Sequence, residues 1–193
     1  MRAILDPLAF PDGWDSLAPA TQRPLRSLVA LVGHRAAGKS RLLPLVCRWT
    51  GLPGIDLDLL VEERAGRSIA ALFTADPQAF RDAERQAFAS IRGPAIVATG
   101  GGFLSLHADL LRDHTAVLVP ITFETYRARL LGDATRPRLR PQLSLEEELA
   151  QVYAEREERH AAADTISLLD FLRASSVAPV GGGSPRASGP QWP

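Results

Sequence analysis

Residues 33–40 read GHRAAGKS and directly follow the apolar run Leu28–Val32. They match the pattern G-x-x-x-x-G-K-[ST] in the setting that this motif requires, with a strand-like segment before it and a helix-like segment after it. Gly33 and Gly38 permit the tight turn in which backbone N–H groups converge on phosphate oxygens at a helix N-terminus. An ordinary glycine-containing turn is the alternative, but the motif position holds Lys39, the only lysine among 22 basic residues. We therefore interpret the segment as a phosphate-binding loop.

The chemistry of such a loop is carried by its lysine and its hydroxyl group. Lys39 is expected to reach the β- and γ-phosphates of ATP, and Ser40 to ligate Mg²⁺. ATP is thus the expected phosphoryl donor and Mg²⁺ the expected cofactor. The nucleotide contacts predicted in and beside the loop are Gly33, Ala36, Ala37, Gly38, Lys39, Ser40 and Arg41.

Short apolar runs alternate with helix-like stretches through the middle of the chain. The expected strands are Leu28–Val32, Gly54–Leu57, Ala95–Ala98, Ala116–Val119 and Thr165–Ser167. The expected helices are Lys39–Thr50, Leu59–Arg64, Pro77–Ile91, Leu106–Arg112, Phe123–Leu131 and Leu145–Ala162. This alternation predicts an α/β protein with a three-layer α/β/α P-loop fold, in which about five parallel strands lie between helices on both faces. In such folds, ligands bind at the carboxyl ends of the strands.

Composition limits the domain organisation. The 193 residues suit one folded domain, which we place at residues 27–173. Residues 1–26 are rich in proline and turn formers and are interpreted as an N-terminal extension. Residues 174–193 are rich in glycine, serine and proline and are predicted to form a disordered tail.

Charge and cysteine content narrow the class of protein further. Because 22 acidic residues balance 22 basic ones, the chain lacks the basic footprint of a nucleic-acid binder. No apolar run approaches the roughly 18 residues of a membrane span, so we expect no membrane partner. Cys47 is the only cysteine and cannot form an internal disulfide, which suits a cytoplasmic location. The four histidines show no metal-ligand spacing and are interpreted as surface or structural residues.

Two carboxylates follow the second expected strand. Asp56 and Asp58 are two residues apart, so on a strand they would point to the same side, toward the phosphate site. One could hold Mg²⁺ while the other accepts a proton from an attacking hydroxyl or orients it. The compatible alternative is that the pair caps the helix expected from Leu59.

Three further features follow in order. Arg81 and Glu84 are three residues apart, on one face of an expected helix. Gly100–Gly102 form a bare backbone after a strand, which a ligand can approach closely. Arg136 and Pro137 lie in a segment, residues 132–142, that we expect to act as a mobile lid.

Together and in this order, these motifs resemble the shikimate kinase family from about Leu28 to Leu172. The resemblance implies that Asp58 contacts the reacting hydroxyl, that Asp56 lies near Mg²⁺, and that Arg81 and Arg156 bind the substrate carboxylate. The remaining implied contacts are Glu84, Gly101 and Gly102 for the acceptor, Arg129 for adenine, and Arg136 as the lid arginine over the phosphates. The implied reaction is the ATP-dependent phosphorylation of the 3-hydroxyl of shikimate, catalysed by Lys39, Asp58 and Arg136, and we expect a monomer.

The chain departs from the family pattern at several points. Arg41 occupies a position where the family usually has threonine, and His160 one where it has tyrosine. The second departure leaves Arg159 as an alternative to Arg156. Two other functions stay open: a kinase of the same fold acting on another small hydroxy acid such as gluconate, and a non-catalytic ligand-binding module.

Overall fold

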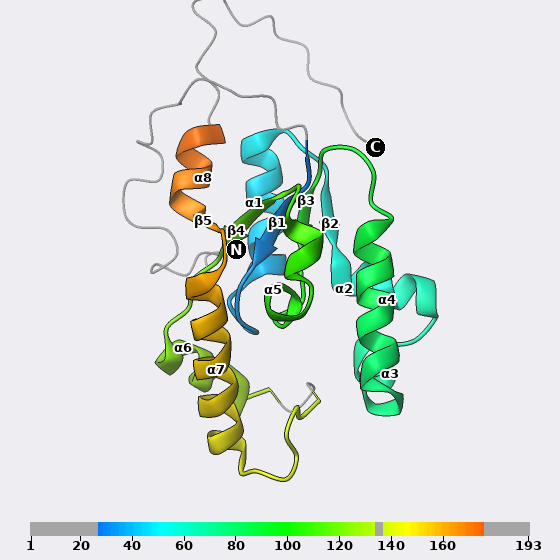
Figure 1. Ribbon diagram of the computed structural model, residues 1–193, viewed down its shortest axis with the longest axis vertical. Coiled ribbons are helices and arrows are strands. Elements are labelled where there is room, and N and C mark those ends of the chain that lie inside the picture. The colour runs from blue at the N-terminus through cyan, green and yellow to red at the C-terminus, as the bar shows by residue number, and fades with distance from the viewer. Residues whose placement is uncertain (1–26, 134–136, 176–193) are drawn as a thin grey trace, which may run out of the picture.

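The computed structural model describes residues 27–133 and 137–175, so the extension, most of the predicted tail and Arg136 lie outside the described residues. Five parallel strands form one sheet in the order β2-β3-β1-β4-β5 (Figure 1). The strands are β1 (Val29–Val32), β2 (Gly54–Asp56), β3 (Ile96–Ala98), β4 (Thr115–Leu118) and β5 (Ile166–Ser167). All five were predicted, within one residue at each end.

Helices cover both faces of this sheet, as predicted. They are α1 (Lys39–Thr50), α2 (Leu57–Ala65), α3 (Ile69–Ala75), α4 (Pro77–Ala89), α5 (Phe103–Leu106), the 3-10 helix η2 (Ala108–Leu111), α6 (Phe123–Leu131), α7 (Leu145–Ala162) and α8 (Leu168–Ser175). Helix α7 begins with the capping box formed by Ser144 and Glu147. No helix in the described ranges combines the length and the apolar character needed to cross a bilayer.

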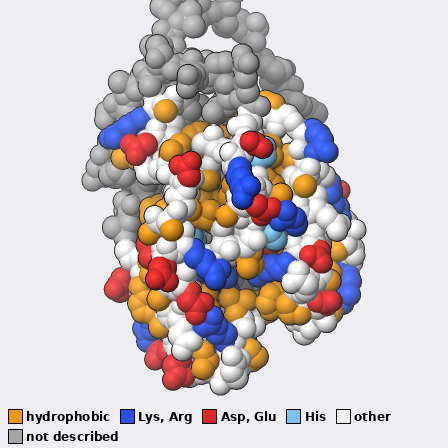
Figure 2. Space-filling model, in the orientation of Figure 1, with side chains coloured by type: hydrophobic (Ala, Val, Ile, Leu, Met, Phe, Trp, Pro, Cys, Tyr) orange, Lys and Arg blue, Asp and Glu red, His pale blue; other side chains and the backbone are white. Residues whose placement is uncertain are grey.

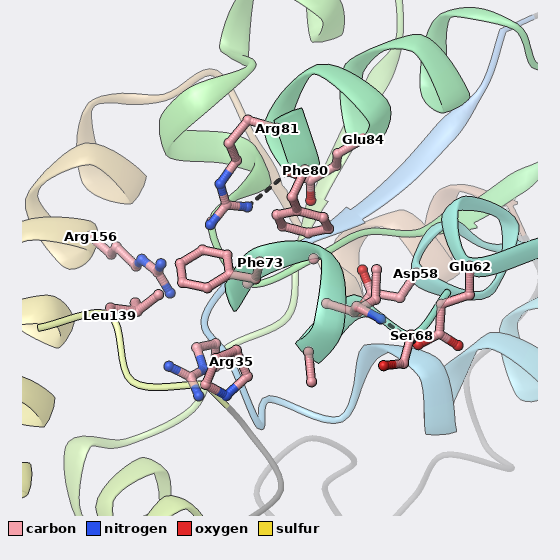
Figure 3. A pocket seen from close by; sticks show the side chains of 16 residues that line it. Arg35, Asp58, Glu62, Ser68, Phe73, Phe80, Arg81, Glu84, Leu139 and Arg156 are labelled. Carbon is pink, nitrogen blue, oxygen red and sulfur yellow. Dashed lines mark hydrogen bonds and ion pairs between the residues drawn. The ribbon is translucent and has the colours of Figure 1, made fainter. Parts of the chain in front are cut away.

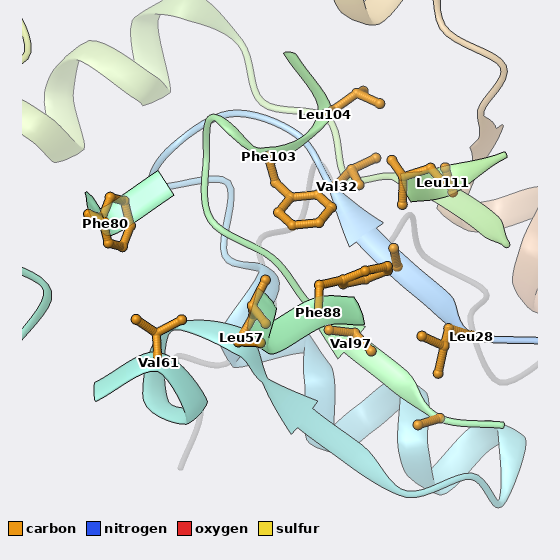
Figure 4. Close-up of a cluster of buried hydrophobic side chains, with 14 residues drawn as sticks. Leu28, Val32, Leu57, Val61, Phe80, Phe88, Val97, Phe103, Leu104 and Leu111 are labelled. Carbon is orange, nitrogen blue, oxygen red and sulfur yellow. The ribbon is translucent and has the colours of Figure 1, made fainter. Parts of the chain in front are cut away.

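Successive side chains of β1 point to opposite faces of the sheet and pack into two different cores. Val29 and Leu31 pack on one face with residues of α1 and α8. Ala30 and Val32 pack on the other face with residues of α2, α4 and α5, where the rings of Phe88 and Phe103 lie 4.8 Å apart (Figure 4). Because β1 is fully buried on both faces, the loop that follows it is held by a rigid strand.

The observed helices differ from the predicted set in several places. The helix expected over residues 106–112 is instead the 3-10 helix η2, preceded by the short helix α5, which ends at Leu106. Helix α3 was not predicted, although Ser68 caps it by accepting a hydrogen bond from the Ala71 backbone N–H. Helix α8 was also missed, and its Leu168, Phe171 and Leu172 complete the core on the α1 face.

Candidate active site

The predicted phosphate-binding loop joins β1 to α1 at the carboxyl edge of the sheet (Figure 1). Gly33 has φ +132°, and a Cβ atom there would lie 2.6 Å from the Val119 carbonyl oxygen, so only glycine fits. Gly38 has φ +90° and is the N-cap of α1. Ala36 also has a positive φ, 57°, a conformation that costs a non-glycine residue energy and is found mostly at functional sites. This backbone is shaped to bind an anion.

Lys39 is the first residue of α1 and is buried. Its Nζ donates hydrogen bonds to the carbonyl oxygens of Gly33 (2.9 Å) and His34 (2.6 Å), across the loop. Arg129 lies at the end of α6, and its Nη1 donates to the Ala36 carbonyl oxygen (2.7 Å). The structure thus places both Lys39 and Arg129 at the loop, and the predicted contact of Arg129 with adenine stays a prediction. Ala37 is buried, while the neighbouring Ser40 and Arg41 are exposed.

The two carboxylates after β2 lie differently from the strand arrangement that we predicted. Strand β2 ends at Asp56, and Asp58 lies in the first turn of α2. Asp56 Oδ1 accepts hydrogen bonds from the backbone N–H groups of Asp58 (3.0 Å) and Leu59 (3.3 Å), so Asp56 is the N-cap. The strand-based argument was wrong because the helix starts at Leu57, two residues earlier than expected.

A cavity of about 310 Å³ opens beside the loop (Figure 3), a size that suits a small-molecule ligand. The structure brings all six predicted acceptor-binding residues to its wall: Asp58, Arg81, Glu84, Gly101, Gly102 and Arg156. These residues come from α2, α4, the loop after β3, and α7. Segments that are far apart in the sequence therefore build one cavity.

Glu84 anchors the polar part of this wall. It is fully buried and accepts a hydrogen bond from Arg81 Nη1 at 2.9 Å. His107 Nε2 lies 3.2 Å from the same oxygen, Glu84 Oε2. Arg81 also lies over the Phe80 ring, with its guanidinium carbon 4.7 Å from the ring centre, so its side chain is fixed from two sides.

The glycines after β3 leave room for these side chains. A Cβ on Gly100 would lie 2.5 Å from Glu84 Oε1, and one on Gly101 would lie 2.5 Å from the backbone nitrogen of Arg35. A Cβ on Gly102 would lie 3.2 Å from Arg156 Nη2 and 3.6 Å from Arg81 Nη1. The two guanidinium groups therefore converge on the backbone at Gly102.

Arg156 is buried within α7, and burial lowers its pKa to about 10. Its Nη1 is buried and has no hydrogen-bond partner among the described residues. Arg159, the alternative, is exposed and donates to the Ser105 carbonyl oxygen. An unsatisfied buried guanidinium is costly unless an anion completes it, so Arg156 is the better candidate for a carboxylate ligand.

Several cavity residues were not predicted as contacts, among them Arg35, Phe73 and Leu139. Arg35 occupies a variable position of the loop motif, yet it reaches the cavity and approaches it from a third segment, beside Arg81 and Arg156 (Figure 3). Phe73 comes from α3, and Leu139 from the segment after the lid arginine. A charged residue within the phosphate-binding loop was the one sequence feature that could have pointed to Arg35 as a cavity residue. No sequence feature pointed to Phe73 or Leu139. The position of Arg136 lies outside the described residues.

The residues proposed for Mg²⁺ suit that ion in their chemistry. Ser40 and Asp56 offer hydroxyl and carboxylate oxygens, the hard ligands that Mg²⁺ prefers. Both cap hydrogen bonds of Asp56 go to Oδ1, and Ser40 is exposed at the loop. Mg²⁺ in phosphoryl-transfer sites uses one or two protein ligands and completes its shell with water and substrate phosphates, so this small donor set fits.

Comparisons with known proteins agree with this geometry. The shikimate kinase family model matches residues 35–178. A shikimate kinase from Chlorobium chlorochromatii is 32% identical over 164 residues, covering 78% of this chain and 86% of the relative. One from Geobacter sulfurreducens is 37% identical over 142 residues, covering 70% and 78%.

A solved structure supports the fold. The shikimate kinase from Acinetobacter baumannii in complex with shikimate matches with a TM-score of 0.64 at 23% identity, over 74% of this chain and 82% of that one. Together with the match to the family model and the sequence relatives, the fold and the cavity lead to one conclusion. The chain belongs to the shikimate kinase family.

Proposed function

We propose that this protein transfers the γ-phosphoryl group of MgATP to the 3-hydroxyl of shikimate, giving ADP and shikimate 3-phosphate. The observation that carries the proposal is the cavity in which Arg81 and Arg156 converge beside Asp58 and the phosphate-binding loop. A small acid held there by its carboxylate would present a hydroxyl to the γ-phosphate. The family relationship supports the same reaction class.

The donor side is assigned to the loop. Its backbone N–H groups and Lys39 would hold the β- and γ-phosphates, with Lys39 exchanging its bonds to the Gly33 and His34 carbonyl oxygens for phosphate oxygens. Mg²⁺, held by Ser40 and through water by Asp56, would neutralise charge between these phosphates. Arg129 is assigned to the adenine side, and Arg136 to the charge that develops on the transferred group.

The acceptor side is assigned to the cavity. Arg156 and Arg81 would bind the carboxylate by charge-assisted hydrogen bonds, while Glu84 fixes Arg81. The backbone at Gly101 and Gly102 would approach the ring hydroxyls. Asp58 would orient the attacking hydroxyl and accept its proton as the new oxygen–phosphorus bond forms and the bond to the ADP oxygen breaks.

The structure offers no specific support for the two alternatives. A linear acid such as gluconate would also meet the arginines, but the apolar wall formed by Ile69, Phe73 and Leu139 favours a compact ring. A non-catalytic module would have no need of Lys39, Ser40 and Asp58 together. We further propose that the enzyme is a monomer and acts in the cytoplasm, the second because a single cysteine suits a reducing compartment.

The test is an ADP-release assay with shikimate, quinate, gluconate or no acceptor. We expect turnover with shikimate to exceed the other three conditions. Lys39→Ala should lower turnover by about 10² or more, the usual effect of removing one preorganised charge contact, while circular dichroism stays unchanged. Equal ADP release with and without acceptor, or a folded Lys39→Ala variant that keeps more than half of the activity, would refute the proposal.

A further inference from the structure

Two histidines that are far apart in the sequence lie side by side where the phosphate-binding loop packs against α7. His34 belongs to the loop and His160 to the last turns of α7, and their ring centres lie 4.5 Å apart. Glu157, one turn before His160, lies 2.8 Å from His34 Nε2. Neither imidazole has a role in the proposed phosphoryl transfer.

The hydrogen bonding of these rings is incomplete. Within the described residues, neither nitrogen of His160 has a hydrogen-bond partner, and Nδ1 of His34 has none. His160 is only 3% exposed and His34 only 2%, so water does not readily replace the missing partners. Buried polar groups without partners are costly and uncommon. Here three such nitrogen atoms lie within one small cluster.

We propose that His34, Glu157 and His160 form a binding site for one divalent transition-metal ion of the Zn²⁺ class. Each residue offers one ligand atom, and these three atoms all lie within 4.8 Å of one another. Tetrahedral Zn²⁺ with bonds of about 2.0–2.1 Å holds its ligand atoms roughly 3.3 Å apart. Small side-chain rotations therefore close the site around an ion, and water completes the coordination.

The donor chemistry selects the class of ion. Two imidazoles and one carboxylate suit Zn²⁺, Co²⁺ or Ni²⁺, whereas Mg²⁺ prefers an all-oxygen shell. Burial lowers the pKa of His34 and lowers that of His160 to about 4, so both rings are neutral near pH 7, the form in which histidine binds metals. This keeps a nitrogen lone pair available on each ring.

Charge makes Glu157 the deciding ligand. Lys39 and Arg156 both act on His160 electrostatically and oppose an added cation. Glu157 supplies the only negative charge among the three ligands, and its side chain is 58% exposed. It therefore provides both the compensating charge and the access from solvent.

Metal binding here would join two parts of the proposed active site. The His34 carbonyl oxygen accepts a hydrogen bond from Lys39, and Arg156 lies one turn before His160 on α7. The His34 ring also stacks on Tyr153 of α7, with ring centres 4.2 Å apart. A bound ion would fix the loop against α7 independently of nucleotide or acceptor.

The test uses untagged, chelator-treated full-length protein without nucleotide. Isothermal titration with ZnCl₂ should show one ion per chain, and CoCl₂ should give the visible absorption of a four- or five-coordinate nitrogen and oxygen site. Excess MgCl₂ should not displace Zn²⁺. ZnCl₂ should also raise the unfolding temperature, because a ligand that binds only the native state stabilises it.

Glu157→Gln is the informative variant because its exposed position makes misfolding improbable. It should weaken Zn²⁺ binding by at least about 10- to 100-fold, the effect of losing even an outer-shell partner of a metal site. His160→Gln should do the same if circular dichroism shows that it folds. Glu158→Gln, also exposed on α7, is the matched control and should leave binding unchanged. Absence of Zn²⁺ binding, displacement by Mg²⁺, or equal affinity in Glu157→Gln and Glu158→Gln would overturn the proposal.

Discussion

Burial lowers the pKa of Arg156 to about 10, and the nearby charges of Arg35 and Arg81 act in the same direction. At pH 7 the guanidinium is protonated in both the folded and the unfolded chain, so the full cost of burying the charge is present. That cost is relieved only as the pH rises above about 10, where the folded state can release the proton first. A lowering of this size corresponds to a free energy on the order of 3 kcal/mol.

Arg156→Met should therefore stabilise the protein without ligand while removing acceptor binding. We expect the free energy of unfolding at pH 7 to rise by about 1–3 kcal/mol, as when other buried charges are replaced by apolar side chains. The KM for shikimate should rise by about 10- to 100-fold, from the loss of one or two charged hydrogen bonds, with little change in the KM for ATP. Denaturant unfolding and steady-state kinetics measure both effects.

Arg159→Met is the control, because that side chain is exposed and donates to a single carbonyl oxygen. It should change neither the free energy of unfolding nor the KM for shikimate by much. A selective loss of acceptor binding in Arg159→Met, with Arg156→Met unaffected, would show that the carboxylate is bound by the other arginine of α7.

Substitutions of Asp56 and Asp58, the two carboxylates at the start of α2, should have different effects on the kinetics. Asn caps a helix about as well as Asp, so Asp56→Asn retains the cap and removes only the charge. It should raise the Mg²⁺ concentration needed for half-maximal activity. Asp58→Asn should lower kcat strongly with little effect on the KM for ATP, because its partner is the acceptor hydroxyl. Mg²⁺ titrations of both variants test the division, and identical profiles would refute it.

At the scale of elements, the sequence predicted what local signals specify. Helices α1, α6 and α7 have the predicted bounds, because glycine, threonine or serine marks the start of each helix. The predicted boundary between β2 and α2 was wrong, because Asp56 is both the last residue of the strand and the N-cap of the helix. Helix α3 has only seven residues. Its Ile69, Leu72 and Phe73 follow helical spacing and pack against the core, but so short a run lies below the window of about 11–18 residues in which that spacing identifies a helix.

Contacts between segments that are distant in the sequence could not be predicted from local sequence patterns. The motifs predicted that Asp58, Arg81, Gly101 and Arg156 share a site, because the family resemblance joined them. Arg35 and the pairing of His34 with His160 became visible only once the loop was placed against the strand β3 edge and α7. Such contacts depend on how elements pack, which spacing within one segment does not encode.

The second half of the predicted lid segment is tied to α7 through Glu148. This residue is buried, and its carboxylate accepts hydrogen bonds from Arg138 Nε and from the Leu139 backbone N–H (2.9 Å). Burial raises the pKa of Glu148, but the hydrogen bonds from Arg138 and the backbone and the charge of Arg138 lower it by more. The net shift of the pKa is therefore downward. Leu139 lines the acceptor cavity, so this anchor also shapes the site.

Glu148→Gln should lower the free energy of unfolding by about 1–3 kcal/mol at pH 7, because it breaks charge-assisted hydrogen bonds in a buried place. Since the folded-state pKa of Glu148 is lowered, its contribution is complete above the ordinary value of 4.5 and is lost as the pH falls through the folded value. The difference between wild type and variant should therefore shrink in acid. Glu146→Gln, which breaks only an exposed pair with Arg127, should have little effect. Equal losses in the two variants would contradict the anchor.

For the whole molecule, the formal charge is zero, and the face in Figure 2 shows acidic and basic side chains interspersed. The cavity separates its charges: Arg35, Arg81 and Arg156 lie on one side of it, with Glu84 bonded to Arg81, while Asp58 and Glu62 lie on the other side (Figure 3). Recognition of an anionic acceptor thus depends on a local concentration of positive charge rather than on the net field. The protein without ligand carries the cost of keeping these cations together.

An acid that binds there should stabilise the whole fold, and its charge should decide by how much. At a concentration of about 100 times Kd, a ligand specific for the native state adds about 2.7 kcal/mol. For a chain of this size, that corresponds to a rise of roughly 5–10 °C in Tm. Shikimate methyl ester keeps the ring and the hydroxyls but leaves the guanidinium donors unpaired, so at the same concentration it should raise Tm much less. In Arg156→Met the gap between acid and ester should narrow, whereas Arg159→Met should keep it. If acid and ester raised the Tm of wild type equally, the arginines would not be holding the carboxylate, and the orientation assigned to the acceptor would have to be abandoned.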